Sequence, residues 1–467
     1  MERKNITVDK IMEICEGELI SRGKESTINS FCADTRKINV GDIFISLKSE
    51  KGLEMQYIKE ALQKGARGCI TEQDIPTEII ENYKDRIIIK VKDIIYAIQK
   101  LAIYKRKMYD IPVIAITGSV GKTSTKDIIA NVLKQKFDVA KTEGNYNNHI
   151  GVPITILNWR ENTNAAVVEM GMNHEGEISV LTNIAKPTIA VITNIGTAHI
   201  GFLGSRENIL KAKLEILEGL TKNGKIIINN DNDMLSNCKT GEYKKITYGI
   251  KNKSNYTAYD INRLDYGSNY KIKIDDKEEE IMVPISGDHF IYNSLCAIAV
   301  GRETGIEINK IIEGIRTFSI TGERNETKKV NDLIIINDYY NASYDSMKAG
   351  LEVLKNIKGK RKIAILGDML ELGDHSEILH KKVGEEVAKN KIDILCTIGD
   401  LSKYIAKEAM MLGTKEVYQF KTNKECINKL KKIIKKGDCV LLKSSNKMNF
   451  GEISNYLQGE NLWEEQN

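Results

Sequence analysis

Three observations predict an α/β protein built from several domains. Short apolar runs rich in isoleucine and valine alternate with helical patterns along most of the chain. The helical patterns that separate the runs indicate parallel strands covered on both faces. The chain has 467 residues, of which 41% are apolar, and an ordinary domain has about 100 to 200 residues. We therefore expect about three α/β domains in series.

We place these domains at residues 1–108, 109–321 and 322–467. In the first domain we predict strands at 43–47 and 87–91 and a helix at 57–64. The second opens at Pro112, and its predicted strands are 113–117, 165–168, 189–193 and 226–228, followed by a β-rich stretch at 251–280. The third is expected to be Rossmann-like, with strands at 333–336, 363–366, 392–398, 417–420 and 439–442.

Composition restricts the partners and the compartment. The formal charge of +5, from 69 basic and 64 acidic residues, suits small phosphate-bearing substrates and is too weak to indicate nucleic acid. The first residues carry no apolar run and no stretch approaches the roughly 18 apolar residues of a spanning helix, so we expect neither a signal peptide nor membrane insertion. Eight cysteines without a C-x-x-C pair suit reduced thiols in a cytoplasmic protein.

A glycine-rich loop follows the predicted strand 113–117 and runs directly into an amphipathic helix. Its residues are Gly118, Ser119, Val120, Gly121, Lys122, Thr123 and Ser124. Glycines let backbone N–H groups surround phosphate oxygens, and the helix N-terminus adds partial positive charge. Lys122 supplies a cation for the outer phosphates, and Thr123 or Ser124 offers a hydroxyl to Mg²⁺. This pattern predicts a central P-loop ATPase domain.

The loop is shorter than the strict Walker pattern, which needs a glycine where Ile116 stands. An alternative interpretation is a strand–turn–helix junction in which glycine only makes the turn. The Gly-Lys-Thr letters in this context favour phosphate binding.

Two further polar residues follow predicted strands of the same sheet. Glu169 ends the run 165–168, where a parallel sheet delivers side chains to a ligand crevice. His199 lies in a glycine-rich loop after another strand. A single histidine is more often structural, but its place at this edge favours a functional role. Lys213, by spacing alone, is only a helix lysine.

Several segments together resemble the Mur ligase family, whose members share the short phosphate loop. The more selective segments are 142–153, 169–178, 337–347 and 366–373, with Ala33-Asp-Thr-Arg36 and 41–48 near the N-terminus. They are most similar to the subfamily that joins D-alanyl-D-alanine to UDP-N-acetylmuramoyl-tripeptide. The resemblance spans essentially the whole chain and implies an N-terminal UDP-substrate domain before the ATPase domain.

The resemblance also implies roles for individual residues. Lys122 and the loop amides would hold the β- and γ-phosphates of ATP, with Thr123 and Glu169 on one Mg²⁺. His199 and Lys213 would serve a second Mg²⁺, and Lys213 would be carbamylated, which turns a cation into an anionic oxygen ligand. Asn293 would contact adenine. Four residues of the third domain would reach the nucleotide: Arg324, Asp338, Tyr340 and Asn341. The UDP end would contact Thr35, Arg36 and Lys48, and the amino-sugar region would contact Asn145, Asn147 and Asn148.

Simpler roles remain open for some of these residues. Asp338 suits a helix N-cap, Asn341 a turn, and Arg36 a surface ion pair. Three segments depart from the family pattern: 51–57 lacks an expected Asp and His, Ser343-Tyr344 replaces Asn-Pro, and Ser444-Ser-Asn446 replaces Gly-Ser-Arg, leaving Lys447 as the nearby cation. These departures spare the phosphate and metal residues.

The function implied is ATP-dependent amide ligation through an acyl phosphate, in peptidoglycan precursor synthesis, by a cytoplasmic monomer. Closure of the third domain over the other two would exclude water from the acyl phosphate. One alternative is a paralogous ligase with another dipeptide or carboxylate. A second is a nucleotide-dependent switch, which the crevice acid, the histidine loop and the third domain disfavour.

Overall fold

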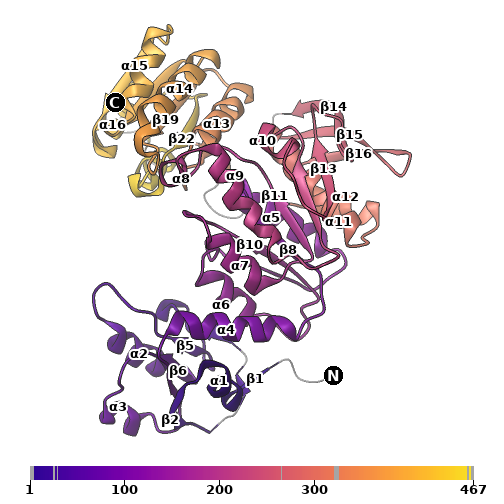
Figure 1. Ribbon diagram of the computed structural model, residues 1–467. Helices are drawn as coiled ribbons and strands as arrows, with labels where there is room; N and C mark the ends of the chain where they lie inside the picture. The colour runs from indigo at the N-terminus through magenta and orange to yellow at the C-terminus, as the bar shows by residue number, and fades with distance from the viewer. Residues whose placement is uncertain are drawn as a thin grey trace.

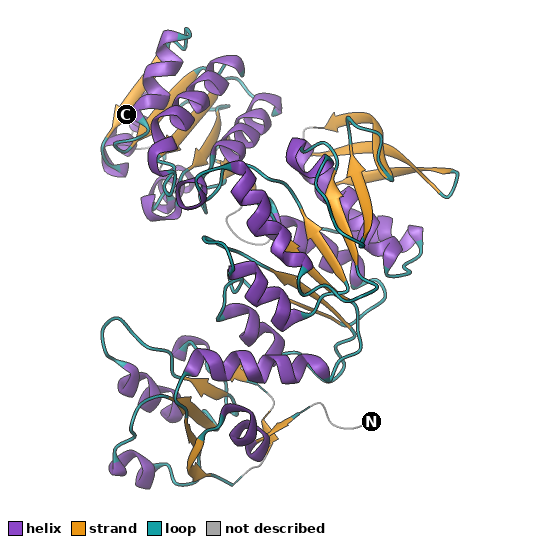
Figure 2. Ribbon diagram, viewed as in Figure 1, coloured by secondary structure: helices purple, strands orange, loops and turns teal. Residues whose placement is uncertain are grey.

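The computed structural model describes residues 5–24, 27–28, 30–264, 266–319, 326–459 and 462–463. Within these residues the chain forms three large β-sheets, each drawn from one continuous part of the sequence. Figure 1 shows the three units in series, from the indigo N-terminal unit through the magenta middle unit to the yellow C-terminal unit. Helices lie against the sheets throughout (Figure 2). The α/β class with three sheet regions, predicted from the alternating pattern, is confirmed.

The N-terminal unit contains a five-stranded sheet of order β2-β7-β6-β5-β4, parallel except for β2. Its strands are β2 (Glu18–Arg22), β4 (Phe31–Cys32), β5 (Ile43–Ile45), β6 (Gly68–Thr71) and β7 (Ile87–Lys90). A separate antiparallel pair joins β1 (Ile6–Thr7) to β3 (Thr27–Ile28). The helices are α1 (Val8–Cys15), η1 (Thr35–Lys37), α2 (Glu54–Gln63), α3 (Thr77–Asn82) and α4 (Ile94–Lys107).

The middle unit contains a nine-stranded sheet of order β16-β15-β14-β13-β12-β11-β8-β10-β9. Its parallel strands are β8 (Val113–Thr117), β9 (Val139–Lys141), β10 (Ala165–Glu169), β11 (Ile189–Ile192), β12 (Lys225–Asn229) and β13 (Lys244–Gly249). The predicted β-rich stretch forms β14 (Tyr256–Leu264), β15 (Gly267–Ile274) and β16 (Lys277–Val283), and β15 pairs antiparallel with both of its neighbours. The helices are α5 (Lys122–Leu133), α6 (Gly151–Leu157), α7 (Glu177–Ala185), α8 (Ile200–Leu203), α9 (Arg206–Leu214), η2 (Glu215–Leu217), α10 (Asp233–Ser236), α11 (Asp288–Glu303) and α12 (Ile308–Arg316).

The C-terminal unit contains a six-stranded sheet of order β17-β18-β22-β19-β20-β21, parallel except for β17. Its strands are β17 (Glu326–Val330), β18 (Leu333–Asn337), β19 (Lys362–Gly367), β20 (Ile394–Ile398), β21 (Glu416–Phe420) and β22 (Cys439–Lys443). Its helices are α13 (Tyr344–Asn356), η3 (Gly373–His375), α14 (Ser376–Lys389), α15 (Lys403–Met411), α16 (Asn423–Ile433), η4 (Asn446–Met448) and α17 (Gly451–Gln458).

Strand β8 shows why the apolar runs of the sequence are unbroken. Because side chains alternate across a strand, Val113 and Ala115 enter the core on one face of the sheet, and Ile114 and Ile116 enter the core on the other. Helices α11 and α12 pack with α5 on the second face, whereas α6 and α7 on the first face also contact α4 of the N-terminal unit. The middle sheet is thus buried on both sides.

The strand order brings three loops to one edge of the middle sheet. The chain passes from β8 to β9 and β10 on one side, then returns to β11 on the other side of β8. Such a reversal opens a crevice at the carboxyl ends of the strands, where α/β proteins bind ligands. The loops that follow β8, β10 and β11 meet there. Among the residues described, no helix is long and apolar enough to cross a membrane.

Candidate active site

The loop after β8 has the backbone of a phosphate cradle. Gly121 has φ +83°, a left-handed conformation that glycine adopts without steric cost, and it directly precedes α5. Gly118 passes so close to the neighbouring strand end that an added Cβ would lie 1.9 Å from Oγ1 of Thr193. These two positions require glycine, so the loop can present its N–H groups at the start of α5.

The loop after β11 holds the phosphate loop from the side. The backbone N–H of Ser119 donates to the carbonyl oxygen of Asn194 at 3.1 Å, and that of Val120 donates to its Oδ1 at 2.9 Å. In return, the N–H of Gly196 donates to Oγ of Ser119 at 2.9 Å. Lys122 Nζ folds back and donates to the carbonyl oxygen of Gly118 at 2.8 Å. The cation predicted to meet the phosphates therefore lies at the loop.

Glu169 lies at the end of β10, and its side chain is almost completely buried. Thr123 Oγ1 donates to its Oε2 at 2.9 Å, and Asn147 Nδ2 donates to its Oε1 at 2.9 Å. Lys126 Nζ lies 3.9 Å from Oε2 and balances the buried charge. The structure thus brings together Thr123 of α5, Glu169 of β10 and Asn147 of the loop between β9 and α6.

His199 begins α8 in a left-handed conformation, with φ +65°. Its Nδ1 lies 3.3 Å from Oε2 of Glu371 in the C-terminal unit, within ion-pair distance. Burial lowers the pKa of His199, although Glu371 opposes that shift. The imidazole is therefore neutral at neutral pH and has a lone pair available.

Lys213 on α9 is fully buried, and its ammonium makes no hydrogen bond or ion pair with any described residue. Burial, reinforced by the nearby charge of Lys122, lowers the pKa of Lys213 well below the usual value of a lysine. Its amine therefore favours the neutral, nucleophilic form.

Only part of the expected metal set is in direct contact: Thr123 bonds Glu169, whereas neither His199 nor Lys213 contacts that pair through a described bond. In the described part of the chain no group of three or more His, Cys, Asp or Glu side chains could hold a metal ion.

A cavity of about 660 Å³ lies between the middle and C-terminal units. Of the residues predicted to bind ligands, those lining it are Ser119, Val120, Gly121, Lys122, Ser124, Asn145, Asn147, Asn148, Glu169, His199, Asn293, Asp338, Tyr340 and Asn341. Asn293 accepts from Thr125 Oγ1 at 2.9 Å, while its Nδ2 is buried without a partner among the described residues. This amide can donate to a ligand in the cavity, and the contact with adenine stays a prediction.

The C-terminal unit contributes an ion pair to the cavity wall. Lys443 Nζ donates to Oδ2 of Asp338 at 2.6 Å, and the lysine side chain is 1% exposed. Asp338 does not cap a helix, because Ser343 is the N-cap of α13. Oδ1 of Asn341 accepts from the N–H of Ala342 at 2.8 Å, the turn role considered from the sequence. The predicted nucleotide contact Arg324 lies outside the described residues.

The residues expected at the UDP end lie in the N-terminal unit, outside the cavity. Arg36 is 85% exposed and forks onto Asp34 through two bonds of 2.8 Å, the surface ion pair considered from the sequence. Thr35 is buried beside it, and Lys48 is exposed in the loop after β5. Lys37 Nζ, 3.4 Å from the hydroxyl of Tyr146, brings this region to the 145–148 loop.

The cavity residues that sequence reasoning did not assign include Lys443, His289 and Glu371. Lys443 ends β22, so the strand-end rule that found Glu169 also applies to it. His289 is half-buried near Asp338, and desolvation lowers its pKa to about 4. Glu371 enters from the 366–373 segment, whose resemblance to the family carried no assigned residue.

Comparisons with known proteins agree with this geometry. Residues 116–301 match the Mur ligase middle domain, and residues 323–446 match the Mur ligase, glutamate ligase domain. The UDP-N-acetylmuramoyl-tripeptide–D-alanyl-D-alanine ligase of Bacillus subtilis is 39% identical over 451 residues, which cover 96% of this chain and 97% of that protein. This chain belongs to the Mur ligase family. The enzyme of the same name from Escherichia coli is 31% identical and covers 97% of this Mur ligase and 98% of its own length.

Solved structures place this Mur ligase in the same fold. MurF from Acinetobacter baumannii superposes with a TM-score of 0.86 at 26% identity, covering 98% of this chain and all of the other. MurF ligase from Thermotoga maritima, solved in complex with ADP, gives a TM-score of 0.78 at 26% identity, covering 91% of this chain and 96% of that one. The similarity therefore includes all three units.

Proposed function

We propose that this Mur ligase uses ATP to join D-alanyl-D-alanine to UDP-N-acetylmuramoyl-tripeptide, a step of peptidoglycan precursor synthesis. The observation that carries the proposal is the shared cavity of about 660 Å³, which residues of the phosphate loop, Asn145 to Asn148 and the C-terminal unit all line. One cavity can therefore present a nucleotide phosphate to an acceptor held by other loops. Full-length similarity to ligases of that name supports the choice of substrates.

The first chemical step transfers the γ-phosphoryl group to the terminal carboxylate of the tripeptide. A carboxylate oxygen attacks phosphorus, and the bond from the γ-phosphorus to the oxygen bridging it to the β-phosphorus breaks, releasing ADP and leaving an acyl phosphate. Lys122 and the loop N–H groups stabilise the charge on the phosphoryl oxygens. The protein contributes mainly position and charge, which suits a cavity built from amides and cations.

In the second step the free amine of D-alanyl-D-alanine attacks the acyl carbon. The tetrahedral intermediate collapses, phosphate leaves with one oxygen of the original carboxylate, and the amine loses a proton. Asp338 and Lys443, on the C-terminal wall of the cavity, place charged groups of both signs where the two substrates would meet. The imidazole of His199, whose lowered pKa keeps it neutral at pH 7, also lines this space.

The oxygen donors around Glu169 fit Mg²⁺. Its carboxylate and the hydroxyl of Thr123 lie 2.9 Å apart in a buried position, and Mg²⁺ prefers such hard oxygen ligands. We propose that these two residues hold the ion, which would neutralise phosphate charge when bound. Ser124, next to Thr123, lines the cavity and offers a second hydroxyl.

We further propose that Lys213 is carbamylated. A buried ammonium that no described residue pairs is costly, and the lowered pKa of Lys213 favours the neutral amine that adds CO₂. The resulting carbamate is an anion with oxygen donors, which His199 and a second cation would complement. The mass of the intact protein before and after mild acid, which releases CO₂ from carbamates, tests this point.

The N-terminal unit would hold the UDP end of the substrate. Thr35 and Arg36 lie next to the 145–148 loop through the contact of Lys37 with Tyr146, so one extended substrate can span both regions. We propose that Thr35, Arg36 and Lys48 contact the diphosphate or uridine, and that Asn145, Asn147 and Asn148 contact the amino sugar. Binding would require Arg36 to exchange Asp34 for phosphate oxygens.

Isotope transfer tests the chemical course. With ¹⁸O in the terminal carboxylate of the tripeptide, the acyl-phosphate route places one ¹⁸O in each released phosphate. Release of unlabelled phosphate during product formation would exclude that route. The measurement is mass analysis of the phosphate ester after derivatisation.

A paralogous ligase with a different dipeptide is the second candidate, because three substrate-facing segments depart from the family pattern. Each departing segment makes a hydrogen bond within the fold. Glu54 accepts from the N–H of Ser49, Ser343 caps α13, and Ser445 Oγ accepts from the N–H of Leu370. A panel of dipeptides at equal concentration separates the candidates. Preference for D-alanyl-D-alanine supports the proposal, and preference for another dipeptide supports the paralogue.

A further inference from the structure

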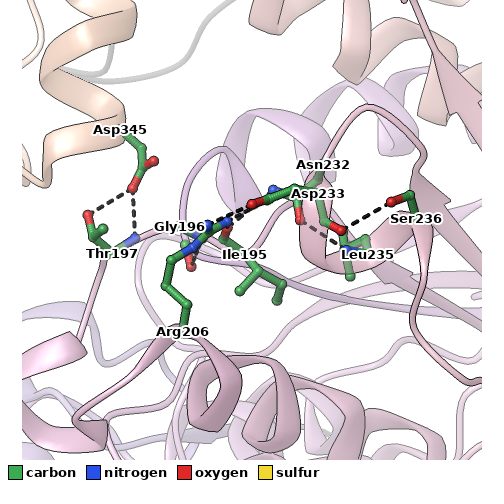
Figure 3. Close-up of polar contacts among 10 residues, drawn as sticks. Ile195, Gly196, Thr197, Arg206, Asn232, Asp233, Leu235, Ser236 and Asp345 are labelled. Carbon is green, nitrogen blue, oxygen red and sulfur yellow. Dashed lines mark hydrogen bonds and ion pairs between the residues drawn. The ribbon is translucent and has the colours of Figure 1, made fainter. Parts of the chain in front are cut away.

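The loop from Asn194 to His199 contacts the phosphate loop on one side and the C-terminal unit on the other. Asn194 and Gly196 bond Ser119 and Val120 of the phosphate loop, as described above. The carbonyl oxygen of Ile195 accepts from Arg206 at 2.8 Å and from Nδ2 of Asn232 at 3.2 Å. Figure 3 shows these anchors within the middle unit. The loop is therefore fixed to the phosphate loop through consecutive residues.

The next residue of this loop, Thr197, is held by the C-terminal unit. Oδ2 of Asp345 accepts from the N–H of Thr197 at 2.7 Å and from its Oγ1 at 2.9 Å (Figure 3). Asp345 is the second residue of α13, and the α13 N-terminus is fixed by the Ser343 cap and its partner Ser346. A carboxylate on a capped helix is a rigid acceptor, and its two hydrogen bonds are charge-assisted.

The contact is closely fitted. A Cβ added to Gly196 would lie 2.3 Å from Oδ2 of Asp345, so a larger residue at that position would displace the carboxylate. Nearby, the N–H of Gly201 donates to the carbonyl oxygen of Glu371 at 3.2 Å, and His375 bonds the carbonyl oxygen of Gly204 at 3.2 Å. Asp345 thus bonds Thr197 in the loop segment that carries Asn194 and Gly196, and Glu371 approaches His199 at the end of the same segment.

We infer that Asp345 is a positioning residue: by holding Thr197, it links the docking of the C-terminal unit to the geometry of the phosphate loop. The inference rests on the proposed function for its effect on catalysis, but the physical link exists in the fold. Docking of the C-terminal unit fixes Thr197, and the bonds of Asn194 and Gly196 pass that constraint to Ser119 and Val120. Phosphoryl transfer is thereby favoured when the C-terminal side of the cavity is in place.

Two substitutions disrupt the link in different ways. Asp345→Ala removes the acceptor, whereas Gly196→Ala leaves the charge and displaces it sterically. Each is expected to lower kcat about tenfold or more, the usual effect of losing a hydrogen bond to a charged group. KM for ATP is expected to change less than about threefold, because Asn293 and Lys122 are untouched. The combined variant should be no slower than the worse single variant, since both remove one contact.

Glu377→Gln is the matched control. Glu377 is also the second residue of a C-terminal-unit helix, α14, but it pairs with Lys381 on its own helix and not across the cavity. It reproduces the loss of an acidic residue near a helix N-terminus, and its kcat should equal that of the wild type.

Amide hydrogen exchange measures the coupling between Thr197 and the phosphate loop without requiring catalytic activity. In Asp345→Ala the amide of Thr197 loses its acceptor, and exchange is expected to quicken there and also at Ser119 and Val120. Faster exchange at Thr197 alone would overturn the inference. So would a combined variant in which the effects of the two single substitutions on kcat multiply. If the wild type makes no product, the proposed function fails, and the exchange at Ser119 and Val120 still decides whether the link exists.

Discussion

Burial sets the charge state of several side chains around the cavity. His289, His199 and Lys213 all have lowered pKa values, and in each case desolvation is the largest cause. These lowered pKa values favour the neutral forms of the two imidazoles and the amine, so the nitrogen groups of this site are not all cations. Lys122 lies at the loop itself, whereas Lys443 on the cavity wall is paired with Asp338, so we expect Lys122 to supply the positive charge for the phosphates.

His289 makes stability depend on pH in a predictable direction. Its pKa is about 4 in the folded protein and near 6.5 when unfolded, so below pH 6.5 the unfolded state binds more protons. The free energy of unfolding therefore falls as pH drops from 6.5 to 4, by about 3 kcal/mol from this residue alone. His289→Gln should reduce that loss in urea unfolding at pH 7 and pH 4. The exposed His174, changed to Gln, should keep the wild-type dependence; equal behaviour of both variants would contradict the assignment.

Lys122→Ala is expected to lower ATP-dependent phosphate release by at least about a thousandfold, because no other group replaces the charge on the γ-phosphate. Phosphate release under saturating substrates is the measurement. The control is Lys134→Ala at the far end of α5, which removes an exposed cation from the same helix and should leave the rate unchanged. Substantial activity in Lys122→Ala would exclude the phosphate-loop chemistry.

The sequence located some site residues because strand ends and glycine loops leave local patterns. Lys122 and Glu169 follow from that rule, and both lie at the cavity. Lys443 also ends a strand, but its pairing with Asp338 joins segments 105 residues apart and leaves no local signal. The hydrogen bond that Thr197 donates to Asp345 also joins distant segments, here from two different units, and leaves no local signal.

At the level of elements, the strand–loop–helix unit from β8 to α5 depends on close packing at Gly118. Gly118→Ala would place a methyl group against Thr193 Oγ1, and its φ of +153° is rarely adopted by other residues. We expect a loss of stability of roughly 2 kcal/mol and at least tenfold weaker binding of an ATP analogue. Thermal unfolding and calorimetric titration measure these two effects.

Gly413→Ala is the control for backbone strain alone. Gly413 has φ +97°, and an added Cβ would meet nothing within 4 Å. It should cost about 1–2 kcal/mol of stability and leave nucleotide affinity unchanged. If both variants bound the analogue like the wild type, packing at Gly118 would not shape the phosphate loop.

Elements with strong apolar periodicity were predictable, and weakly apolar ones were not. The predicted runs at 113–117 and 439–442 correspond to β8 and β22, both buried on two faces. Strand β17 was missed because its sequence, Glu-Thr-Lys-Lys-Val, is half-exposed at a sheet edge and lacks an apolar run. Antiparallel pairing with β18 creates that strand through tertiary contact, which sequence propensity does not register.

At the scale of the whole molecule, we propose that the N-terminal unit holds the UDP end of the substrate outside the cavity. Arg36→Ala is expected to raise KM for the UDP substrate about tenfold with little change in kcat, because a contact far from the reacting atoms contributes uniform binding. Initial rates over a range of UDP substrate provide both constants. Arg22→Ala, which removes another exposed arginine paired with Asp9, should leave them unchanged. A fall in kcat alone for Arg36→Ala would place this residue elsewhere in the mechanism.

The middle unit supplies the phosphate loop and the 145–148 loop, and the C-terminal unit supplies the facing wall, of one cavity. The measurement that tests this account most directly is incubation of the purified protein with ATP, UDP-N-acetylmuramoyl-tripeptide and D-alanyl-D-alanine. We predict one phosphate released per product, and a product heavier by the dipeptide less one water. Phosphate release that continues without the dipeptide, with the tripeptide substrate unchanged in mass, would contradict the assignment of amide ligation.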